Sequence, residues 1–280
     1  MLLAVAGALW MATPWVLARE IAPVRFVLSF DDGPSGEHED NPTESILDAL
    51  AGNPTQAGIK AIFFVTTRSS GAGATPRGRA LLAREHAQGH VLALHDGSPR
   101  GHPNHRMLSD GELEESLRDG AADLRAITGR RVALVRPPYW AYDARTRAAY
   151  ARHDLVMLLT DISANDGKAW GFRASPRRRS HMASELARVH ARMMRGELTA
   201  VEGVTPIVVT FHDTNDYTAA HMQEYLQMLV DEARSAGIAL AAPPFYDDGA
   251  ELERAALARA RDNITHLADM VPWWWRWILW

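Results

Sequence analysis

Two adjacent carboxylates, Asp31 and Asp32, end an apolar run and are followed at once by Gly33-Pro34. The residues before them, 24–28, are mostly apolar and β-branched or aromatic, a pattern that predicts a buried strand with an abrupt turn after it. Two carboxylates in such a place repel each other and lose solvation, so they require a metal ion or an arginine beside them. The alternative is a solvated Asp-Gly turn, which the apolar lead-in and the trailing proline disfavour.

Histidines supply the other side chains whose chemistry suits a metal site. The chain contains 12 histidines and no cysteine, so disulfides and zinc–thiolate sites are excluded and any metal must bind imidazole and carboxylate groups. His95 and His212 each follow directly on an apolar run, 91–94 and 207–211 respectively. Asp32, His95 and a second histidine would form a three-ligand site with open positions for water.

These residues must be positioned by strands that alternate with helices. Seven apolar runs predict strands, at 24–28, 61–65, 91–94, 132–135, 155–159, 207–211 and 238–241. Capping residues and helical periodicity predict helices at 42–50, 76–88, 109–128, 184–195, 219–236 and 252–267. Such alternation is typical of a parallel α/β sheet.

Polar residues follow five of the predicted strands. They are Asp31 and Asp32, His95, Arg136, Asp161 and His212. The carboxyl ends of these strands become neighbours only if the sheet closes into a barrel or curves strongly. We therefore expect an α/β domain with a barrel-like sheet and its chemistry at one end.

Five segments, taken in order, resemble the motifs of a known family. Residues 29–34, Ser-Phe-Asp-Asp-Gly-Pro, resemble the first motif of the polysaccharide deacetylases (chitooligosaccharide deacetylase type, carbohydrate esterase family four), usually written Thr-Phe-Asp-Asp-Gly-Pro. The segments 89–95, 136–139, 161–166 and 207–213 resemble the second to fifth motifs, the second and fourth only loosely. The resemblance implies an irregular (β/α)7-type barrel in a single catalytic domain, here 23–248, that hydrolyses N-acetyl groups of an amino-sugar polysaccharide.

The second motif of the family has two histidines separated by three residues, and this chain departs from it. The residue four positions after His95 is Pro99, which cannot bind a metal. His102, which precedes a proline, restores the pattern if a three-residue insertion is accommodated, and His105 is the second candidate. The resemblance thus implies a divalent metal, with Zn²⁺ preferred, bound by Asp32, His95 and His102.

The resemblance also implies the roles of five residues around the metal. Asp31 is expected to act as general base, and Arg136 to orient it and keep it ionised. The Tyr139 backbone N–H is expected to face the developing oxyanion. His212 is expected to act as general acid, with Asp161 hydrogen-bonded to it so that its pKa is raised.

A rival interpretation comes from a different class of protein. The irregular second motif, the threonine at Thr210 in place of a leucine that contacts the acetyl methyl, and the missing tryptophan after Asp166 favour a catalytically impaired glycan-binding protein on the same barrel. The presence of Asp31, Asp32 and His212 argues against this interpretation, because a protein that only binds glycans has no need of them. A metal phosphoesterase is disfavoured, because the sequence shows neither a second metal cluster nor a Gly-rich phosphate loop.

The segments at the two ends of the chain predict where the protein is located. Residues 1–18 are apolar and uncharged and end in Val-Leu-Ala, which predicts a signal peptide or N-terminal anchor and an exported, periplasmic or extracellular protein. Residues 249–280 are expected to form a C-terminal helix and a Trp-rich tail, and 273–280 suit packing on the barrel or a peripheral membrane contact but are too few to span a bilayer. The formal charge of −4 gives no reason to expect a nucleic acid, and an acetylated glycan is the expected partner.

Overall fold

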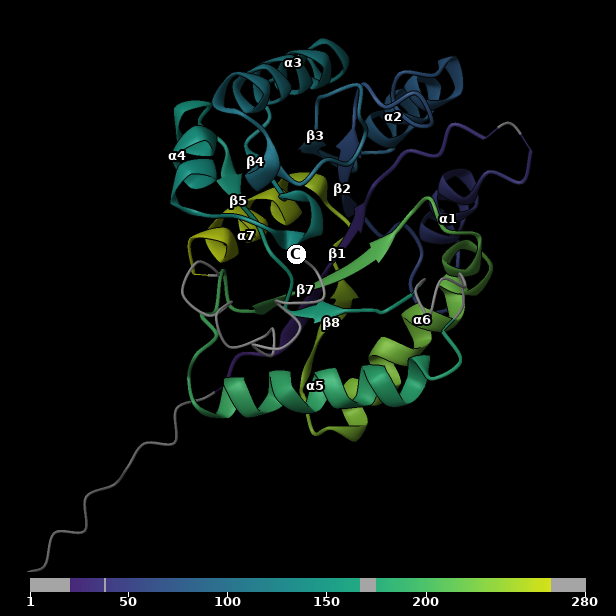
Figure 1. The fold of residues 1–280 in the computed structure, drawn as a ribbon. Helices are drawn as coiled ribbons and strands as arrows, with labels where there is room; N and C mark the ends of the chain where they lie inside the picture. The colour runs from purple at the N-terminus through teal and green to yellow at the C-terminus, as the bar shows by residue number, and fades with distance from the viewer. Residues whose placement is uncertain (1–20, 38, 167–174, 263–280) are drawn as a thin grey trace, which may run out of the picture.

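A parallel sheet of eight strands organises the chain in the computed structural model, which describes residues 21–37, 39–166 and 175–262 (Figure 1). The strands are β1 (Val24–Asp31), β2 (Ala61–Thr66), β3 (Val91–Asp96), β4 (Leu134–Val135), β5 (Val156–Met157), β6 (Ile162–Ser163), β7 (Thr205–His212) and β8 (Leu240–Phe245). Their order is β5-β4-β3-β2-β1-β7-β6, and β8 pairs with the first residues of β1. The sheet curls into a barrel. The barrel is open, because within the described residues the end strands β5 and β6 do not pair. The predicted α/β barrel is confirmed.

Helices connect the strands and cover the outside of the sheet. They are α1 (Pro42–Ala51), α2 (Pro76–Ala87), α3 (Asp110–Thr128), α4 (Ala144–Arg152), α5 (Arg178–Met194), α6 (Asp216–Ser235) and α7 (Gly249–Asp262), with 3₁₀ turns η1 (His105–Met107) and η2 (Pro138–Trp140). Three of the helices begin at a capping side chain: those of Asn41, Thr75 and Ser109 accept backbone N–H groups at the starts of α1, α2 and α3.

Three features of the fold differ from the sequence-based expectation. The helix α4 was not predicted, because it buries only Thr146, Ala149 and Tyr150 and so lacks a long apolar stripe. The strand β6 was not predicted either, since it contains two residues and leaves no periodic signal. The helix α5 begins at Arg178, before the expected start at 184, and has no side-chain cap to mark its first turn.

The inner face of the curled sheet changes from apolar to polar along the strands. Its apolar part packs against α7 and contains Val27, Ile62, Phe64, Val91, Ala93, Leu134, Leu158 and Val208 from the sheet side, with Leu252, Ala255, Ala256 and Ala260 from the helix. Because side chains on one face of a strand recur at every second residue, Ser29 and Asp31 continue this face on β1, and Thr210 and His212 continue it on β7. The helix α7 therefore fills the apolar end of the barrel, and the polar end stays available for chemistry.

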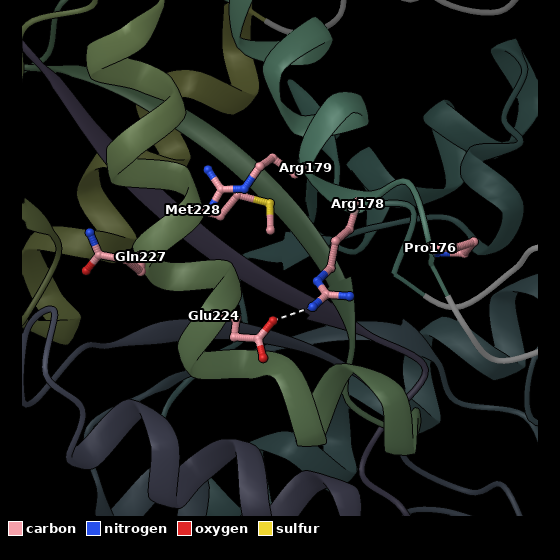
Figure 2. Close-up of a pocket in the computed structure, with 6 residues that line it drawn as sticks. All are labelled: Pro176, Arg178, Arg179, Glu224, Gln227 and Met228. Carbon is pink, nitrogen blue, oxygen red and sulfur yellow. Dashed lines mark hydrogen bonds and ion pairs between the residues drawn. The ribbon is translucent and has the colours of Figure 1, made fainter.

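An arginine-rich segment lines a hollow on the outside of the barrel, between α5 and α6 (Figure 2). The hollow has a volume of about 520 Å³, and its lining includes Arg178, Arg179 and Met228. Arg178 forms an ion pair with Glu224, and Arg179 forms one with Glu232. Their positive charges are therefore balanced within the protein.

The predicted signal segment 1–18 and the Trp-rich end 273–280 lie outside the described residues. In the part of the chain that the structure describes, none of the helices has the length and hydropathy needed to cross a membrane.

Candidate metal centre and active site

Asp32, His95 and His102 converge at the carboxyl end of the barrel. Asp32 Oδ1 lies 2.9 Å from His102 Nε2 and 3.2 Å from His95 Nε2, and the two Nε2 atoms are 3.1 Å apart. One ligand atom from each of the three residues lies within 4.8 Å of the others. Asp32 directly follows β1, His95 is on β3, and His102 is in the loop between β3 and η1. The insertion in the second motif is thus accommodated, and His102 rather than His105 reaches this cluster.

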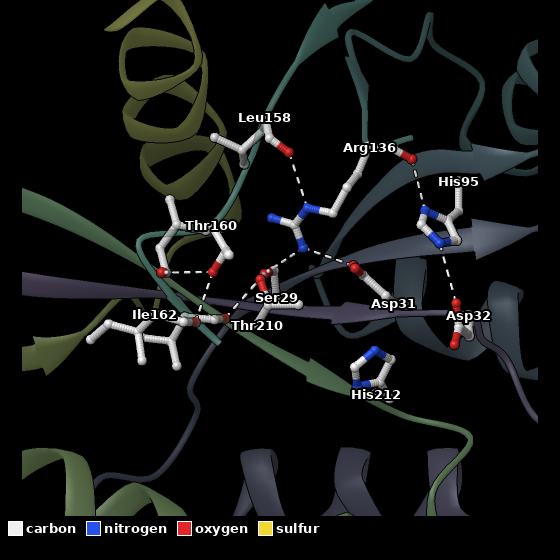
Figure 3. A network of polar contacts seen from close by, with 12 residues as sticks. Ser29, Asp31, Asp32, His95, Arg136, Leu158, Thr160, Ile162, Thr210 and His212 are labelled. Carbon is white, nitrogen blue, oxygen red and sulfur yellow. Dashed lines mark hydrogen bonds and ion pairs between the residues drawn. The ribbon is translucent and has the colours of Figure 1, made fainter. Parts of the chain in front are cut away.

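The hydrogen bonding of His95 shows that the cluster suits a cation. His95 Nδ1 lies 2.8 Å from the carbonyl oxygen of Arg136, which can only accept, so Nδ1 carries the proton. Nε2 is then the nitrogen left to hold a second proton or a metal ion, and it faces the buried Asp32 Oδ1, which is an acceptor (Figure 3). A carboxylate oxygen and two imidazole nitrogens facing one another without thiolates are a donor set that fits zinc or a similar divalent ion.

Asp32 is a carboxylate in this arrangement. Burial opposes its ionisation, but the interactions with His102 and His95 hold its pKa well below the usual value. Burial likewise opposes protonation of His95, while Asp32 and Asp31 raise the pKa of its imidazole. The residues around the centre therefore favour positive charge at the point where the three ligand atoms meet.

Asp31 is held by a buried arginine, Arg136, as the family resemblance implied. Arg136 Nη1 donates to Asp31 Oδ1 at 2.7 Å and to Ser29 Oγ at 2.9 Å, and its Nε donates to the carbonyl of Leu158 at 3.0 Å. The guanidinium lies 4.0 Å from the centre of the Phe64 ring. Asp31 is 2% exposed and Arg136 fully buried, so the cation compensates a carboxylate that water scarcely reaches.

His212 has a carboxylate partner, but it is Asp166. Asp166 Oδ1 lies 2.9 Å from His212 Nδ1, and Oδ2 accepts the backbone N–H of His212 at 2.7 Å and the hydroxyl of Thr218 at 2.6 Å. Burial opposes protonation of His212, but Asp166, together with the charges of Asp32 and Asp31, raises its pKa to about 10. His212 is therefore a cation that can donate a proton.

The expectation that Asp161 supports His212 is wrong. The Asp161 carboxylate instead binds Arg259 of α7 at 2.6 Å, Arg192 of α5 at 2.9 Å and the backbone N–H of Val208 at 3.0 Å. It therefore fixes α7 and α5 to the sheet. Arg259 and Asp161 are both buried, as Arg136 and Asp31 are.

The reason for this error is the unpredicted strand β6. It pairs in parallel with β7, with Ile162 opposite Val209 and Ser163 opposite Thr210, so the chain after Ser163 runs toward His212. Asp161 lies at the start of this pairing and Asp166 beyond its end. Both aspartates fall within the stretch that resembles the fourth motif. The sequence alone does not give the register of β6 against β7, which is needed to choose Asp166.

Tyr139 lies at the rim of the centre. Its ring meets the ring of His102 edge-on, with 4.5 Å between centroids, and the residue is 56% exposed. Its backbone is in the left-handed region, at φ 59° and ψ 11°, and so is that of Trp140, at φ 54°. Two such residues in succession are a strained turn held beside the ligands. The role of the Tyr139 amide toward an oxyanion stays a prediction.

Thr210 lies one layer below His212 and faces the polar network. Its Oγ1 is 3.1 Å from Ser29 Oγ, which is itself bonded to Arg136, and Thr210 is fully buried (Figure 3). Its hydroxyl therefore has a partner, and the polar residue is accommodated without an unsatisfied group.

Comparisons with known proteins give one family match. The family model described as polysaccharide deacetylase matches residues 21–158, a stretch that contains Asp31, Asp32, His95, His102 and Arg136. No match was found among curated proteins.

Solved structures of deacetylases share the fold. The chitin deacetylase from Colletotrichum lindemuthianum is 22% identical, with 79% of this chain and 85% of that chain covered and a TM-score of 0.56. A family 4 carbohydrate esterase from Streptomyces lividans is 23% identical, with 78% and 97% covered and a TM-score of 0.54. A peptidoglycan deacetylase from Bacillus subtilis is 23% identical, with 87% and 96% covered and a TM-score of 0.54. With Asp31, Asp32, His95, His102 and Arg136 gathered at one end of this barrel, the segment 21–158 belongs to the polysaccharide deacetylase family.

Proposed function

We propose that the protein is a metal-dependent hydrolase that removes N-acetyl groups from an amino-sugar polysaccharide. The observation that supports this most directly is the convergence of Asp32 Oδ1, His95 Nε2 and His102 Nε2 at the strand ends that also present Asp31 and His212. A divalent ion held by these three residues, for which we propose zinc, would supply Lewis-acid polarisation of a carbonyl and a lower pKa for water.

Asp31 acts as the general base in this proposal. Arg136 occupies Asp31 Oδ1, which leaves Oδ2 to accept a proton from the attacking water. The buried guanidinium fixes the orientation of the carboxylate, so the base is aligned before the substrate binds. Asp31 and His212 are paired residues on the neighbouring strands β1 and β7, which brings a base and an acid to one edge of the sheet.

His212 acts as the general acid and donates a proton to the leaving amine. Its bond to Asp166 through Nδ1 leaves Nε2 as the nitrogen that faces a substrate, and the same carboxylate keeps the ring protonated. The proposed base therefore lies beside a cation and the proposed acid beside an anion. We propose that the Tyr139 amide stabilises the oxyanion.

The family implies an acetylated glycan as substrate. We further infer from the apolar segment 1–18 that the protein is exported to the compartment in which such polymers lie. We also infer that the Trp-rich end 273–280 makes a peripheral membrane contact.

The test is acetate release by the full chain from N-acetylated chitooligosaccharides and peptidoglycan fragments. We expect release with added Zn²⁺ or Co²⁺, loss of release with a chelator, and recovery when the metal is restored. Glycan binding without acetate release from any substrate, in folded metal-loaded protein, would instead support the glycan-binding alternative.

A further inference from the structure

The loop that carries His102 is tied at both ends to one buried carboxylate. This loop runs from the end of β3 to the start of η1. At its beginning, the Ser98 backbone N–H and hydroxyl donate to Asp96 Oδ2 at 2.7 and 2.6 Å. At its end, His105 Nε2 lies 3.2 Å from Asp96 Oδ1. Asp96 and His105 are both fully buried, so these bonds are shielded from water.

The chemistry of these groups determines the direction of each bond. A carboxylate only accepts, so His105 Nε2 carries a proton and donates it to Asp96. His105 Nδ1 is then the acceptor for the Tyr150 hydroxyl, 2.8 Å away. Tyr150 belongs to α4 and is 1% exposed, and Arg145 of the same helix donates to the His105 carbonyl at 3.0 Å. The far end of the loop is therefore fixed to α4.

The near end of the loop is fixed to α3. Ser116 donates its hydroxyl to Asp96 Oδ1 at 2.8 Å and accepts the Gly97 backbone N–H at 3.0 Å. Gly97 lies so close to this helix that an added Cβ would be 2.1 Å from the Ser116 carbonyl oxygen. Two helices and one strand thus hold the two ends of the loop in place.

We propose that Asp96, His105 and Tyr150 form a latch that positions His102 for metal binding. This inference rests on the proposed metal centre. The side chain of His102 is about a third exposed, at 31%, and it contacts Asp32, His95 and the Tyr139 ring. Its position must therefore be determined mainly by the path of the loop. His105 is thus a positioning residue.

The test is metal binding by the purified, metal-free full chain. Titration with Co²⁺, followed by visible absorption, gives both a dissociation constant and a spectrum that reports ligand geometry. We expect His105→Phe to raise the dissociation constant about 10- to 100-fold, as is usual when a group that orients a ligand is removed, and to change the spectrum. Tyr150→Phe should have a smaller effect in the same direction.

Two further variants separate positioning from general stability. His105→Gln can donate to Asp96 and accept from Tyr150, so it should restore much of the affinity that His105→Phe loses. Leu124→Ala removes a buried side chain of α3 that lies outside the latch, and it should lower the melting temperature without changing the dissociation constant.

The outcomes distinguish the latch from the metal centre. Wild-type affinity and spectrum in His105→Phe would overturn the latch. The latch would also be overturned if Leu124→Ala, with the same melting temperature as His105→Phe, lost as much affinity. Absence of Co²⁺ and Zn²⁺ binding by the wild-type chain would overturn the proposed metal centre itself.

Discussion

The site takes its residues from two kinds of backbone. Asp31, His95 and His212 stand on strands, and their directions are set by hydrogen-bonded neighbours in the sheet. His102 and Asp166 stand in segments beyond strand ends, and their directions are set by side-chain contacts and loop path. Changes to Asp31 and His212 on the strands should therefore remove proton transfer, whereas changes to the partners of His102 and His212 should alter metal affinity or a pKa while the fold persists.

The largest effect is expected from Asp31→Asn. The amide cannot accept a proton, so acetate release should fall on the order of 10²- to 10⁴-fold while Co²⁺ binding is retained. The measurements are kcat/KM with a glycan that wild type deacetylates and the Co²⁺ dissociation constant. Asp154→Asn, at an exposed ion pair with Arg131, is the matched control and should act as wild type. Turnover near the wild-type rate in Asp31→Asn would show that the base is another group.

The next effect concerns the free energy of unfolding. Arg136→Met leaves Asp31 buried without its cation, and breaking a buried pair in this way costs about 3–5 kcal/mol. Arg131→Met removes the arginine of an exposed pair, where the expected cost is about 0–1 kcal/mol. Urea unfolding of the two variants measures the difference. Equal costs would mean that the strand-end pair is no more tightly coupled to the fold than a surface pair.

A smaller effect is expected when the loop partner of His212 is changed. His212 must be protonated to act as an acid, so activity should fall as the pH rises through its pKa, which is about 10 in the folded protein. Asp166→Asn removes the charge that raises this pKa, so the fall in kcat should move to lower pH, by about 1 to 3 units. The measurement is the pH dependence of kcat for the metal-loaded enzyme.

Asp161→Asn is the contrasting variant. Asp161 binds Arg259 and Arg192 rather than His212, so its replacement should lower stability without moving the basic limb of the pH profile. A shift in Asp161→Asn, and none in Asp166→Asn, would restore the role that the sequence suggested for Asp161.

The same comparison explains how much the sequence could predict. The strands and the barrel follow from apolar runs that end in polar residues. The pair of Asp31 with Arg136 followed from the family resemblance, since β1 and β4 are separated in the sheet by β2 and β3. The choice between Asp161 and Asp166 required the register of β6, which two residues cannot reveal in a sequence.

The histidines of the inserted loop show a second limit. His102 and His105 were both candidates, since each follows His95 within one loop. Only the structure shows His102 beside Asp32 and His105 buried against Asp96 and Tyr150. Long-range contacts determine which of the two histidines lies beside Asp32, and local sequence patterns do not show such contacts.

The smallest effect is expected at Thr210, where the strand leaves the family pattern. Ser29 donates its one hydroxyl proton to the Val209 carbonyl at 3.0 Å, so the Thr210 hydroxyl must donate to Ser29 Oγ. Thr210→Val removes this bond but leaves Ser29 bonded to Arg136, so the cost should be near 1 kcal/mol in the free energy of unfolding.

Thr210→Leu should cost more than Thr210→Val, because a larger side chain at a fully buried position overpacks the layer by about 1–3 kcal/mol. In both variants the KM for an acetylated glycan should stay at the wild-type value, since the side chain faces Ser29 beneath the reacting groups. Urea unfolding and steady-state kinetics of the two variants check both statements. A lower KM in Thr210→Leu, with an unfolding free energy equal to that of wild type, would show that this position contacts the acyl group after all.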